Sequence, residues 1–475
     1  MHTLRTIPGE EQPSQQPNEH HQALSDDQEP LLPPAAASQQ QASAELLPAD
    51  KFYISLLLFT LLGVGSLLPW NFFTTARSYF EYKLRNVSNI TGWPDQPWMR
   101  DTFESYLAVF SNLPGVLCVL ANAAAAGRVT IAGRMVVSLS LMSAMFACSA
   151  AFVLVDTDWH QSEFFWATLA SVALMSGSGA VMQGSLFGLA AMFPKRYINA
   201  VTLGQASGGV IAAVAYIISL EIGSHPRSAA FLYFLSATVV LLMCLAAYLL
   251  LRRLSFVRDR LCRARGADLT DSLTIPTPTP TPSPTLHEAP NRRRLSNRPA
   301  WRHLIGPGGG AFAVLTITLT LYPALLSSLS PMSEPWLLYS PLCCFLVYNT
   351  FDLFGRFLTA AAPTPGTCGR ANFSLILLAL LRLLFVPLFL MCNYTLGGEQ
   401  RRLMPVYFAW DWAPPLLVSA FGLSNGYLFT LCFMRASEQA PTHLAESHGA
   451  VMSMCAVVGS STGSALSFLF TAGTR

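Results

Sequence analysis

The sequence predicts an all-α integral membrane protein in which eleven transmembrane helices form a group of six followed by a group of five. Of the 475 residues, 52% are hydrophobic and only 12% are charged, whereas an ordinary soluble domain has about 25% charged residues. Apolar runs of about 20 residues, the length that crosses a hydrocarbon core, recur between short polar breaks. So long and so apolar a chain has too little polar surface to stay folded in water.

The N-terminal segment, residues 1–51, is predicted to be a disordered tail. It is rich in Gln, Pro, Ser and Ala, and it holds no apolar run long enough to form a core. The first long apolar run begins near Phe52, so we expect this run to be the first membrane anchor, without a cleavable signal peptide.

The eleven spans follow from the positions of the apolar runs. Six fall within an N-terminal half, residues 52–252, and five within a C-terminal half, residues 303–475. Between the halves lies a polar loop, residues 253–302, which is rich in Arg, Pro and Thr. An odd number of spans places the two termini on opposite sides of the membrane. The spans are expected at 53–76, 104–126, 132–155, 163–192, 198–222, 228–251, 304–329, 336–361, 372–392, 408–433 and 446–470.

The distribution of basic residues predicts a cytosolic N-terminus and a luminal C-terminus. The loop after the sixth span holds eleven Arg between Arg252 and Arg302, and loops rich in Lys and Arg stay on the cytosolic side. Three Asn-x-Ser/Thr sequons then fall on the luminal side, where oligosaccharide is added. We therefore predict glycosylation at Asn86, Asn89 and Asn393.

The eighth span carries ionisable residues that are costly in a bilayer. Asp352 and Arg356 are four residues apart and lie on one helical face, with Asn349 one turn before Asp352. A charged side chain at the bilayer centre costs about 2.5–3.5 kcal/mol on insertion scales, so it usually faces a cavity or a partner. The pair is either a self-neutralising bridge between helices or a polar patch lining a path for a hydroxylated solute. An Arg fork donates and a carboxylate accepts, which suits paired sugar hydroxyls.

Two further side chains are candidates for a binding cavity. Gln183, in the fourth span, presents a donor and an acceptor together, as the edge of a nucleobase requires. The alternative for Gln183 is a hydrogen bond between helices. Trp70 follows Pro69 near the luminal end of the first span, where it either joins the interfacial aromatic belt or stacks on a ring inside the cavity.

Charged residues at span ends are candidates for a gate. Arg134 begins the third span and Glu446 begins the eleventh, both on the cytosolic side but in different halves. Each is either a separate interfacial anchor, or the two pair and close that side of the protein. Glu104 and Glu221 sit at luminal span ends and are expected at the membrane interface.

The sequence argues against several other classes of protein. It contains neither a Cys-x-x-Cys motif nor a Cys/His cluster, so we expect no metal site. No Gly-rich phosphate loop stands between a strand and a helix, which excludes an ATP-driven pump, and no catalytic module suggests an enzyme or a cofactor. A receptor would more typically have seven spans without paired charges at mid-membrane. The net charge is only +3 and the basic residues are mostly Arg beside spans, so nucleic acid is not an expected partner.

Four stretches of the sequence carry a family resemblance. Two lie in the N-terminal half, Gly65 to Phe73 and Gln183 to Leu189, and two lie in the C-terminal half, Asn349 to Arg356 and Leu423 to Leu428. Together they resemble the equilibrative nucleoside transporters, across nearly all of 52–471. The resemblance implies a fold related to the major facilitator superfamily and transport by alternating access between two halves.

The same resemblance implies roles for individual residues. Asp352 and Arg356 would hold the ribose and Gln183 the base, while Trp70 would wall the cavity. Asn349 belongs to the same matching stretch and is expected among the substrate-binding residues. At the cytosolic side, Arg134 and Glu446 would close the path.

Two stretches make the chain most similar to the lysosomal member of that family. The tail segment Asp27 to Leu32 fits an acidic dileucine signal for a clathrin adaptor, with Asp27 four residues before Leu31 and Leu32. The stretch Phe103 to Val109 also resembles that member. We therefore expect residence in the lysosomal or late endosomal membrane.

The resemblance implies a facilitative carrier that moves purine and pyrimidine nucleosides from an acidic lumen to the cytosol. Nucleobases are a further candidate class of substrate. Because luminal carboxylates such as Glu104 and Glu221 would titrate between lumen and cytosol, the cycle is expected to be proton-linked or activated by acid. The alternative is a plasma-membrane carrier of the same family without pH dependence.

Overall fold

The computed structural model describes residues 53–75, 77–88, 97–126, 128–222, 226–262, 303–322, 324–333, 336, 338–361, 369–394, 405–441 and 444–473. All of them belong to one compact unit, Ala49–Arg475. The sorting residues Asp27, Leu31 and Leu32 and the sequon residue Asn89 lie outside the described residues.

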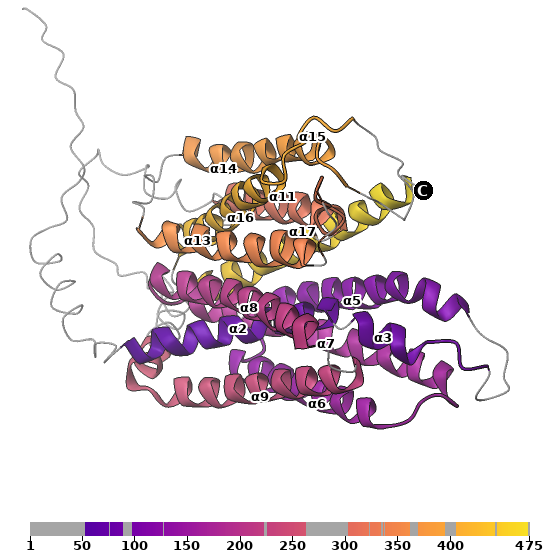
Figure 1. Cartoon of the computed structure of the whole chain (residues 1–475). Helices are drawn as coiled ribbons and strands as arrows, with labels where there is room; N and C mark the ends of the chain where they lie inside the picture. The colour runs from indigo at the N-terminus through magenta and orange to yellow at the C-terminus, as the bar shows by residue number, and fades with distance from the viewer. Residues whose placement is uncertain are drawn as a thin grey trace, which may run out of the picture. The chain divides into compact units, whose positions relative to one another are not determined.

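The first helix group contains the six spans expected before the long loop, together with one short additional helix. Figure 1 shows this group in indigo to magenta. The short helix α3 follows the first span directly and belongs to the first connecting loop. The group consists of α2 (Ile54–Thr75), α3 (Arg77–Lys83), α5 (Pro97–Ala125), α6 (Ile131–Leu154), α7 (Gln161–Ala191), α8 (Lys195–Ile222) and α9 (Pro226–Arg253).

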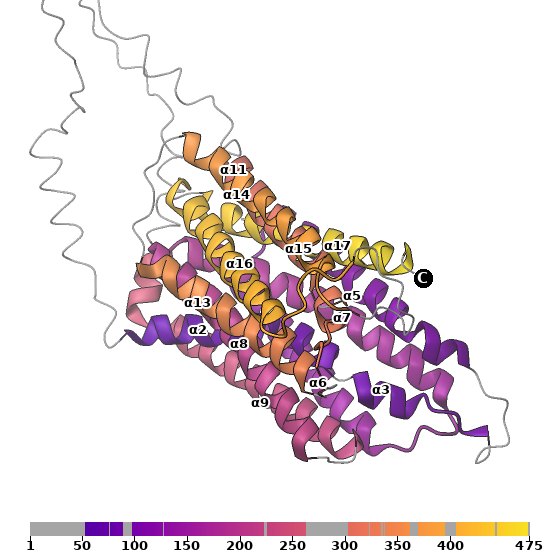
Figure 2. The ribbon, with the colours of Figure 1, turned by 45° about the horizontal axis from the view of Figure 1, so that its top comes forward.

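The second helix group covers the five spans expected after the long loop and is drawn in orange to yellow in Figures 1 and 2. Two of its spans change helix type along their length: a π-helix opens the eighth span, and a 3-10 turn interrupts the ninth. The group consists of α11 (Ile305–Leu321), α12 (Ala324–Ser327), η3 (Pro341–Val347), α13 (Tyr348–Ala361), α14 (Gly369–Leu381), η4 (Arg382–Leu384), α15 (Phe385–Leu390), α16 (Ala413–Glu438) and α17 (Ala445–Gly473).

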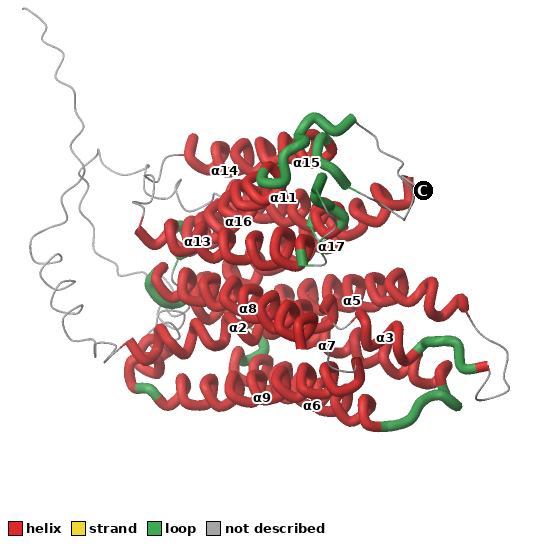
Figure 3. Tube along the Cα trace, in the orientation of Figure 1, coloured by secondary structure: helices red, strands yellow, loops and turns green. Residues whose placement is uncertain are grey.

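The predicted all-α class is confirmed. The described residues form helices and loops without a strand, apart from an isolated bridge between Leu329 and Tyr394 (Figure 3). Among them, nine helices are long and apolar enough to cross a membrane, and α2 adds a shorter apolar stretch, Ile54–Leu67. The remaining expected span is divided between η3 and α13, and the total of eleven spans stays a prediction. Helices suit a bilayer because they satisfy every backbone polar group within the segment.

The tenth span differs from its predicted boundaries. It was expected at 408–433, but α16 runs from Ala413 to Glu438. Pro414 and Pro415 lie in its first turn, where a missing N–H breaks no helical hydrogen bond, so the helix starts there and 405–409 is irregular. The apolar residues before Pro414 misled the prediction because hydropathy alone does not register a helix start.

The beginning of the polar loop 253–302 is also more ordered than expected. Residues 255–262 are helical. Phe256 and Val257 are buried, and the Phe256 ring stacks on Tyr197 of α8 with 6.0 Å between centroids. These apolar side chains extend the core beyond the sixth span.

The two helix groups meet along an interface that we call the seam. On one side of it lie α5, α7 and α8, and on the other lie η3, α13, α16 and α17. Within the second group, α13 and α16 pack with their backbones in contact, because a β-carbon at Gly426 would overlap the Asp352 carbonyl. This close approach brings the polar residues of α13 and α16 together.

Candidate functional site

The predicted charge pair of the eighth span lies buried at the seam. Arg356 Nε donates to Asp352 Oδ2 at 2.9 Å, one helical turn away on α13. The two residues are 5% and 4% exposed, and the guanidinium also lies 5.0 Å from the centroid of the Phe429 ring. Two charges so deeply buried are stable only when their remaining polar atoms find partners.

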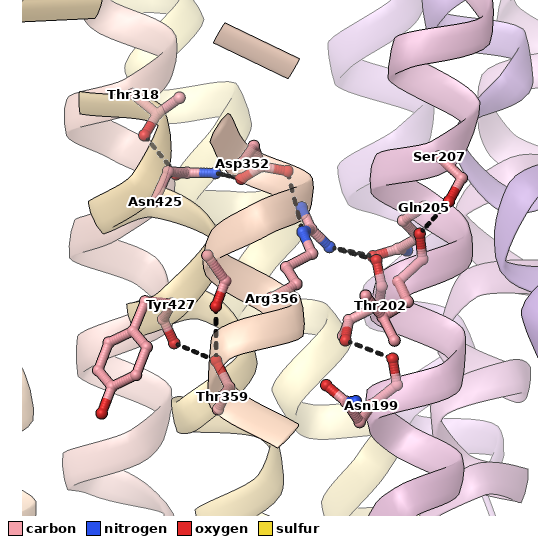
Figure 4. Close-up of polar contacts among 12 residues, drawn as sticks. Asn199, Thr202, Gln205, Ser207, Thr318, Asp352, Arg356, Thr359, Asn425 and Tyr427 are labelled. Atoms are coloured by element: carbon pink, nitrogen blue, oxygen red, sulfur yellow. Dashed lines mark hydrogen bonds and ion pairs between the residues drawn. The ribbon is translucent and has the colours of Figure 1, made fainter. Parts of the chain in front are cut away.

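Arg356 finds its further partners in the other helix group. Its Nη1 donates to the carbonyl of Thr202 at 2.9 Å and to Gln205 Oε1 at 3.4 Å, both on α8. Gln205 Nε2 in turn donates to the hydroxyl of Ser66 on α2 at 3.0 Å. Figure 4 shows Arg356 reaching from α13 across the seam to α8. The pair therefore joins the two groups and is more than a bridge within one of them.

Asp352 is held from the opposite side by residues of its own group. Asn425 Nδ2 on α16 donates to Asp352 Oδ1 at 2.6 Å (Figure 4). The amide oxygen of Asn425 accepts from the hydroxyl of Thr318 on α11 at 2.7 Å. Arg382, at the start of η4, donates to the Thr318 hydroxyl at 2.9 Å. Each carboxylate oxygen of Asp352 thus has a defined donor.

Asn349 lies next to the seam, one turn before Asp352. Its amide nitrogen donates to the Phe345 carbonyl at 2.8 Å and to the Tyr322 hydroxyl at 3.4 Å. Its amide oxygen faces Gly209 of α8, where a β-carbon would collide with it. The structure therefore places Asn349 on the face of the eighth span that meets α8.

The other two expected substrate residues lie in the first helix group. Gln183 is half-buried in α7, a helix that packs against α17, and makes no hydrogen bond to another described residue. Trp70 lies in α2, but its side chain is outside the described part of the chain. The side chains of Glu104 and Glu221 are likewise not described.

The expected gate residues meet at one end of the bundle, where α7 and α16 finish and α8 and α17 begin; we call it the Glu446 end. Arg134 Nη2 forms an ion pair with Glu446 Oε1 across the seam. Arg134 Nη1 also donates to Asn122 Oδ1 on α5 at 2.8 Å. A second ion pair joins the groups at this end, since Lys195 Nζ lies 2.8 Å from Glu438 Oε1.

Two described sequons differ in the state of their asparagine. Asn86 is exposed, and its Oδ1 accepts from the backbone N–H of Ser88 at 2.9 Å and from its hydroxyl at 2.7 Å. Asn393 is half-buried, and its Nδ2 donates to the carbonyls of Ser330 at 3.1 Å and Pro331 at 3.0 Å. The nitrogen that would carry a glycan is thus engaged at Asn393.

Lys83, which lies outside the spans at the end of α3, has a shifted pKa. Burial lowers the pKa of Lys83, and neighbouring Arg227 adds to this effect, while Asp156 and Asp158 oppose it. The Lys83 ammonium donates to the carbonyl of Val155 at 2.6 Å, next to the end of α6. A cation at a helix C-terminus complements the helix dipole.

Sequence reasoning missed Arg382, Gln205 and Thr318 as members of this site. Arg382 had a visible signal, because an Arg within the apolar run 372–392 is as costly as Arg356 in the eighth span. Gln205 had a weaker one, as a polar residue within the fifth span. Thr318 had none, since a helical Thr normally bonds its own helix. Among the described residues, no three His, Cys, Asp or Glu gather as metal ligands would.

Two helix groups that meet at a buried ion pair, within a chain of many apolar helices, give the chain a multi-pass membrane fold like that of the major facilitator superfamily. The proton:xylose symporter XylE of that superfamily matches with a TM-score of 0.53 and 13% identity, covering 88% of this chain and 86% of its own. This likeness shows the fold, as the sequence had predicted.

The family follows from closer relatives. A family model described as nucleoside transporter matches residues 169–472. Equilibrative nucleoside transporter 3 of Rattus norvegicus is 36% identical over 433 residues, covering 89% of this chain and 90% of that protein. Equilibrative nucleoside transporter 2 of Homo sapiens is 32% identical over 460 residues, covering 90% and 98%. The chain belongs to the equilibrative nucleoside transporter family, and it is a transporter, not an enzyme.

Proposed function

We propose that this chain carries purine and pyrimidine nucleosides down their gradient by alternating access, with the substrate bound at the seam. The observation that carries the proposal is the buried pair of Asp352 and Arg356, because Arg356 bonds both its own helix and α8 of the other group. A substrate that replaces the bonds of Arg356 to α8 changes the contact between the groups, which is what coupling of binding to a conformational change requires.

The chemistry of the pair fits a ribose. The two adjacent hydroxyls of the sugar can donate to Asp352 and accept from Arg356. Gln183 has no described hydrogen-bond partner, so its amide is available for a base edge. Asn349 adds an amide on the same face as the pair, and Trp70 of α2 is proposed as an aromatic wall. The two halves proposed from the sequence, residues 52–252 and residues 303–475, would each form one wall of the binding cavity.

The Glu446 end is proposed as the cytosolic side, in keeping with a cytosolic N-terminus. Arg134 with Glu446 would form the gate there, and Lys195 with Glu438 would reinforce it. With these pairs closed, the substrate would enter from the lumen and leave after they separate. Glycosylation at Asn86 and Asn89 is proposed on the luminal side, together with Asn393.

The compartment is proposed to be the lysosome or late endosome. The support is the acidic dileucine segment with Asp27, Leu31 and Leu32, which a clathrin adaptor would bind in the cytosol. An acidic lumen would favour a proton-linked or acid-activated cycle, and nucleobases are proposed as additional substrates. A plasma-membrane carrier without pH dependence is the second candidate.

The test is uptake of labelled adenosine and uridine into cells that express a Leu31→Ala, Leu32→Ala variant at their surface. We expect Asp352→Ala and Arg356→Ala each to lower uptake at least tenfold, because a hydrogen bond to a charged group contributes about 1.5–3 kcal/mol. Uptake measured at pH 5.5 and at pH 7.4 tests the acid dependence. Normal uptake by both variants at normal surface levels would contradict the site, and equal uptake at the two pH values would favour the plasma-membrane alternative.

A further inference from the structure

A second buried cation, Arg382, lies near the Asp352–Arg356 pair and has no role in the proposed function. Arg382 is 2% exposed, yet among the described residues no carboxylate lies within ion-pair distance of it. Its donors go to neutral acceptors: the Val314 carbonyl at 2.9 Å, the Phe421 carbonyl at 3.2 Å and the hydroxyl of Ser424 at 3.1 Å. A buried charge held only by neutral groups is costly and calls for an explanation.

The contacts of Arg382 lead to Asp352 through two intermediate side chains. Arg382 Nη1 donates to Thr318 Oγ1 at 2.9 Å and approaches Asn425 Oδ1 at 3.4 Å. The single hydroxyl proton of Thr318 has two acceptors within reach, the Val314 carbonyl at 2.8 Å and Asn425 Oδ1 at 2.7 Å. Arg382 also donates to the Val314 carbonyl, so donation of the Thr318 proton to Asn425 leaves both acceptors with a donor. Asn425 Nδ2 then donates to Asp352 Oδ1 at 2.6 Å.

This arrangement permits one orientation of the Asn425 amide. If the amide were turned over, its NH₂ would face the N–H groups of Arg382, and its oxygen would face the carboxylate of Asp352. Both contacts would be repulsive. Asp352 and Arg382 therefore fix the orientation of the Asn425 amide from its two ends, although Arg382 itself does not touch Asp352.

We propose that Arg382, Thr318 and Asn425 form a relay that positions Asp352 for the ribose hydroxyls, with Arg382 as a positioning residue for substrate recognition. The relay fixes Asp352 Oδ1 from within the second helix group, which leaves Oδ2 for Arg356 and for an incoming hydroxyl. The three residues of the relay all lie within that group, on η4, α11 and α16. The Asp352 carboxylate therefore keeps its orientation while the bonds of Arg356 to α8 change. This inference rests on the proposed function, in which Asp352 binds the ribose.

The relay predicts a change in substrate discrimination beyond any loss of rate. A site that hydrogen-bonds sugar hydroxyls rejects an analogue that lacks them. We therefore compare uptake of uridine with uptake of 2′,3′-dideoxyuridine, which lacks the adjacent 2′ and 3′ hydroxyls of the ribose. The preference for uridine is the ratio of the two Vmax/KM values, and a general defect in folding or trafficking lowers both values equally.

Thr318→Val is the central variant, because valine keeps the shape of threonine and removes the hydroxyl. We expect the preference for uridine to fall about tenfold, the effect of one lost hydrogen bond in a charge-assisted chain. Thr318→Ser keeps the hydroxyl and should retain the preference for uridine. Thr320→Val is the matched control on the same helix, since within the described part of the chain the Thr320 hydroxyl bonds only the carbonyls of Thr316 and Gly463.

A second variant keeps the test decisive if Thr318→Val does not reach the surface. Arg382→Lys retains the charge but has no planar fork with which to hold Thr318 and the carbonyls together. We expect the same loss of preference. An unchanged preference in Arg382→Lys or in Thr318→Val would overturn the relay.

Asp352→Ala separates this inference from the proposed function. If Asp352→Ala abolishes the preference while Thr318→Val retains it, the relay is wrong and Asp352 still binds the ribose. If Asp352→Ala itself retains the preference for uridine, the proposed ribose site fails, and the relay fails with it.

Discussion

At the scale of single residues, the site depends on completing every polar bond around a buried charge. Arg356 alone would be a cation in a low-dielectric medium, but its donors reach Asp352, Thr202 and Gln205. Removing one partner leaves a buried polar group without a hydrogen bond, and this costs more free energy than the intact bond contributed. For this reason single substitutions in the network are expected to have large effects.

A residue outside the spans gives a prediction about pH. The pKa of Asp411 is held below its ordinary value of 3.8 by a hydrogen bond from the Ser333 hydroxyl and by another from the Met332 backbone N–H. A carboxylate whose folded pKa is lowered stabilises the fold above its unfolded pKa, and the contribution disappears as the pH falls through the folded pKa.

We therefore expect Asp411→Asn to lower the melting temperature equally at pH 7.4 and at pH 5.5, because the carboxylate is ionised at both. The difference from the unchanged protein should close only below about pH 4. Scanning fluorimetry in detergent measures this. A difference that shrinks already between pH 7.4 and 5.5 would show that another titrating group holds this loop.

At the scale of elements, close backbone packing of α13 and α16 brings Asn425 to Asp352. Gly426 lies against the Asp352 carbonyl and the Arg356 N–H, and Gly355 lies against the Leu423 carbonyl. Small residues let membrane helices approach this closely. The sequence shows these glycines but not the helix that each one contacts.

Gly426→Ala is expected to push α16 away from α13, lengthen the bond between Asn425 and Asp352, and destabilise the protein by about 1–3 kcal/mol, as overpacking does. Gly179→Ala is the matched control, because no atom of the described residues lies within 4 Å of a β-carbon at Gly179. Thermal unfolding and uridine uptake together measure the effect. Equal stability of the two variants would contradict the close packing of α13 and α16.

At the scale of the whole molecule, the Glu446 end is closed by two ion pairs. Lys195 is the first residue of α8 and Glu438 the last of α16, so each charge sits at the end of a helix where the dipole disfavours it. Arg435 of the same helix lies 3.9 Å from Glu438 and offsets part of its cost. The pairing of Lys195 with Glu438 across the seam at 2.8 Å offsets both positions.

Lys195→Glu should therefore weaken closure of this end and reduce the population that faces the lumen. We expect KM for luminal uridine to rise about twofold, the effect of an exposed ion pair of about 0.5 kcal/mol. The double variant Lys195→Glu, Glu438→Lys should return KM to its original value. Glu163→Lys serves as the control, since Glu163 is exposed and, among the residues that the structure describes, pairs only with nearby His160. Failure of the double variant to restore KM would remove this pair from the gate.

The sequence by itself determined the membrane class, the all-helical fold, the approximate helix positions and the family, because apolar runs of bilayer length and long matching stretches are local properties of a chain. It also marked Asp352, Arg356, Arg134 and Glu446, since a charge within or beside an apolar run is costly wherever the run packs. Only the tertiary structure decided which partners these charges have. Arg382 and Thr318 lie 30 or more residues from Asp352 in sequence. They reach it through Asn425 because α11, α13, η4 and α16 pack together, which no single run of residues specifies.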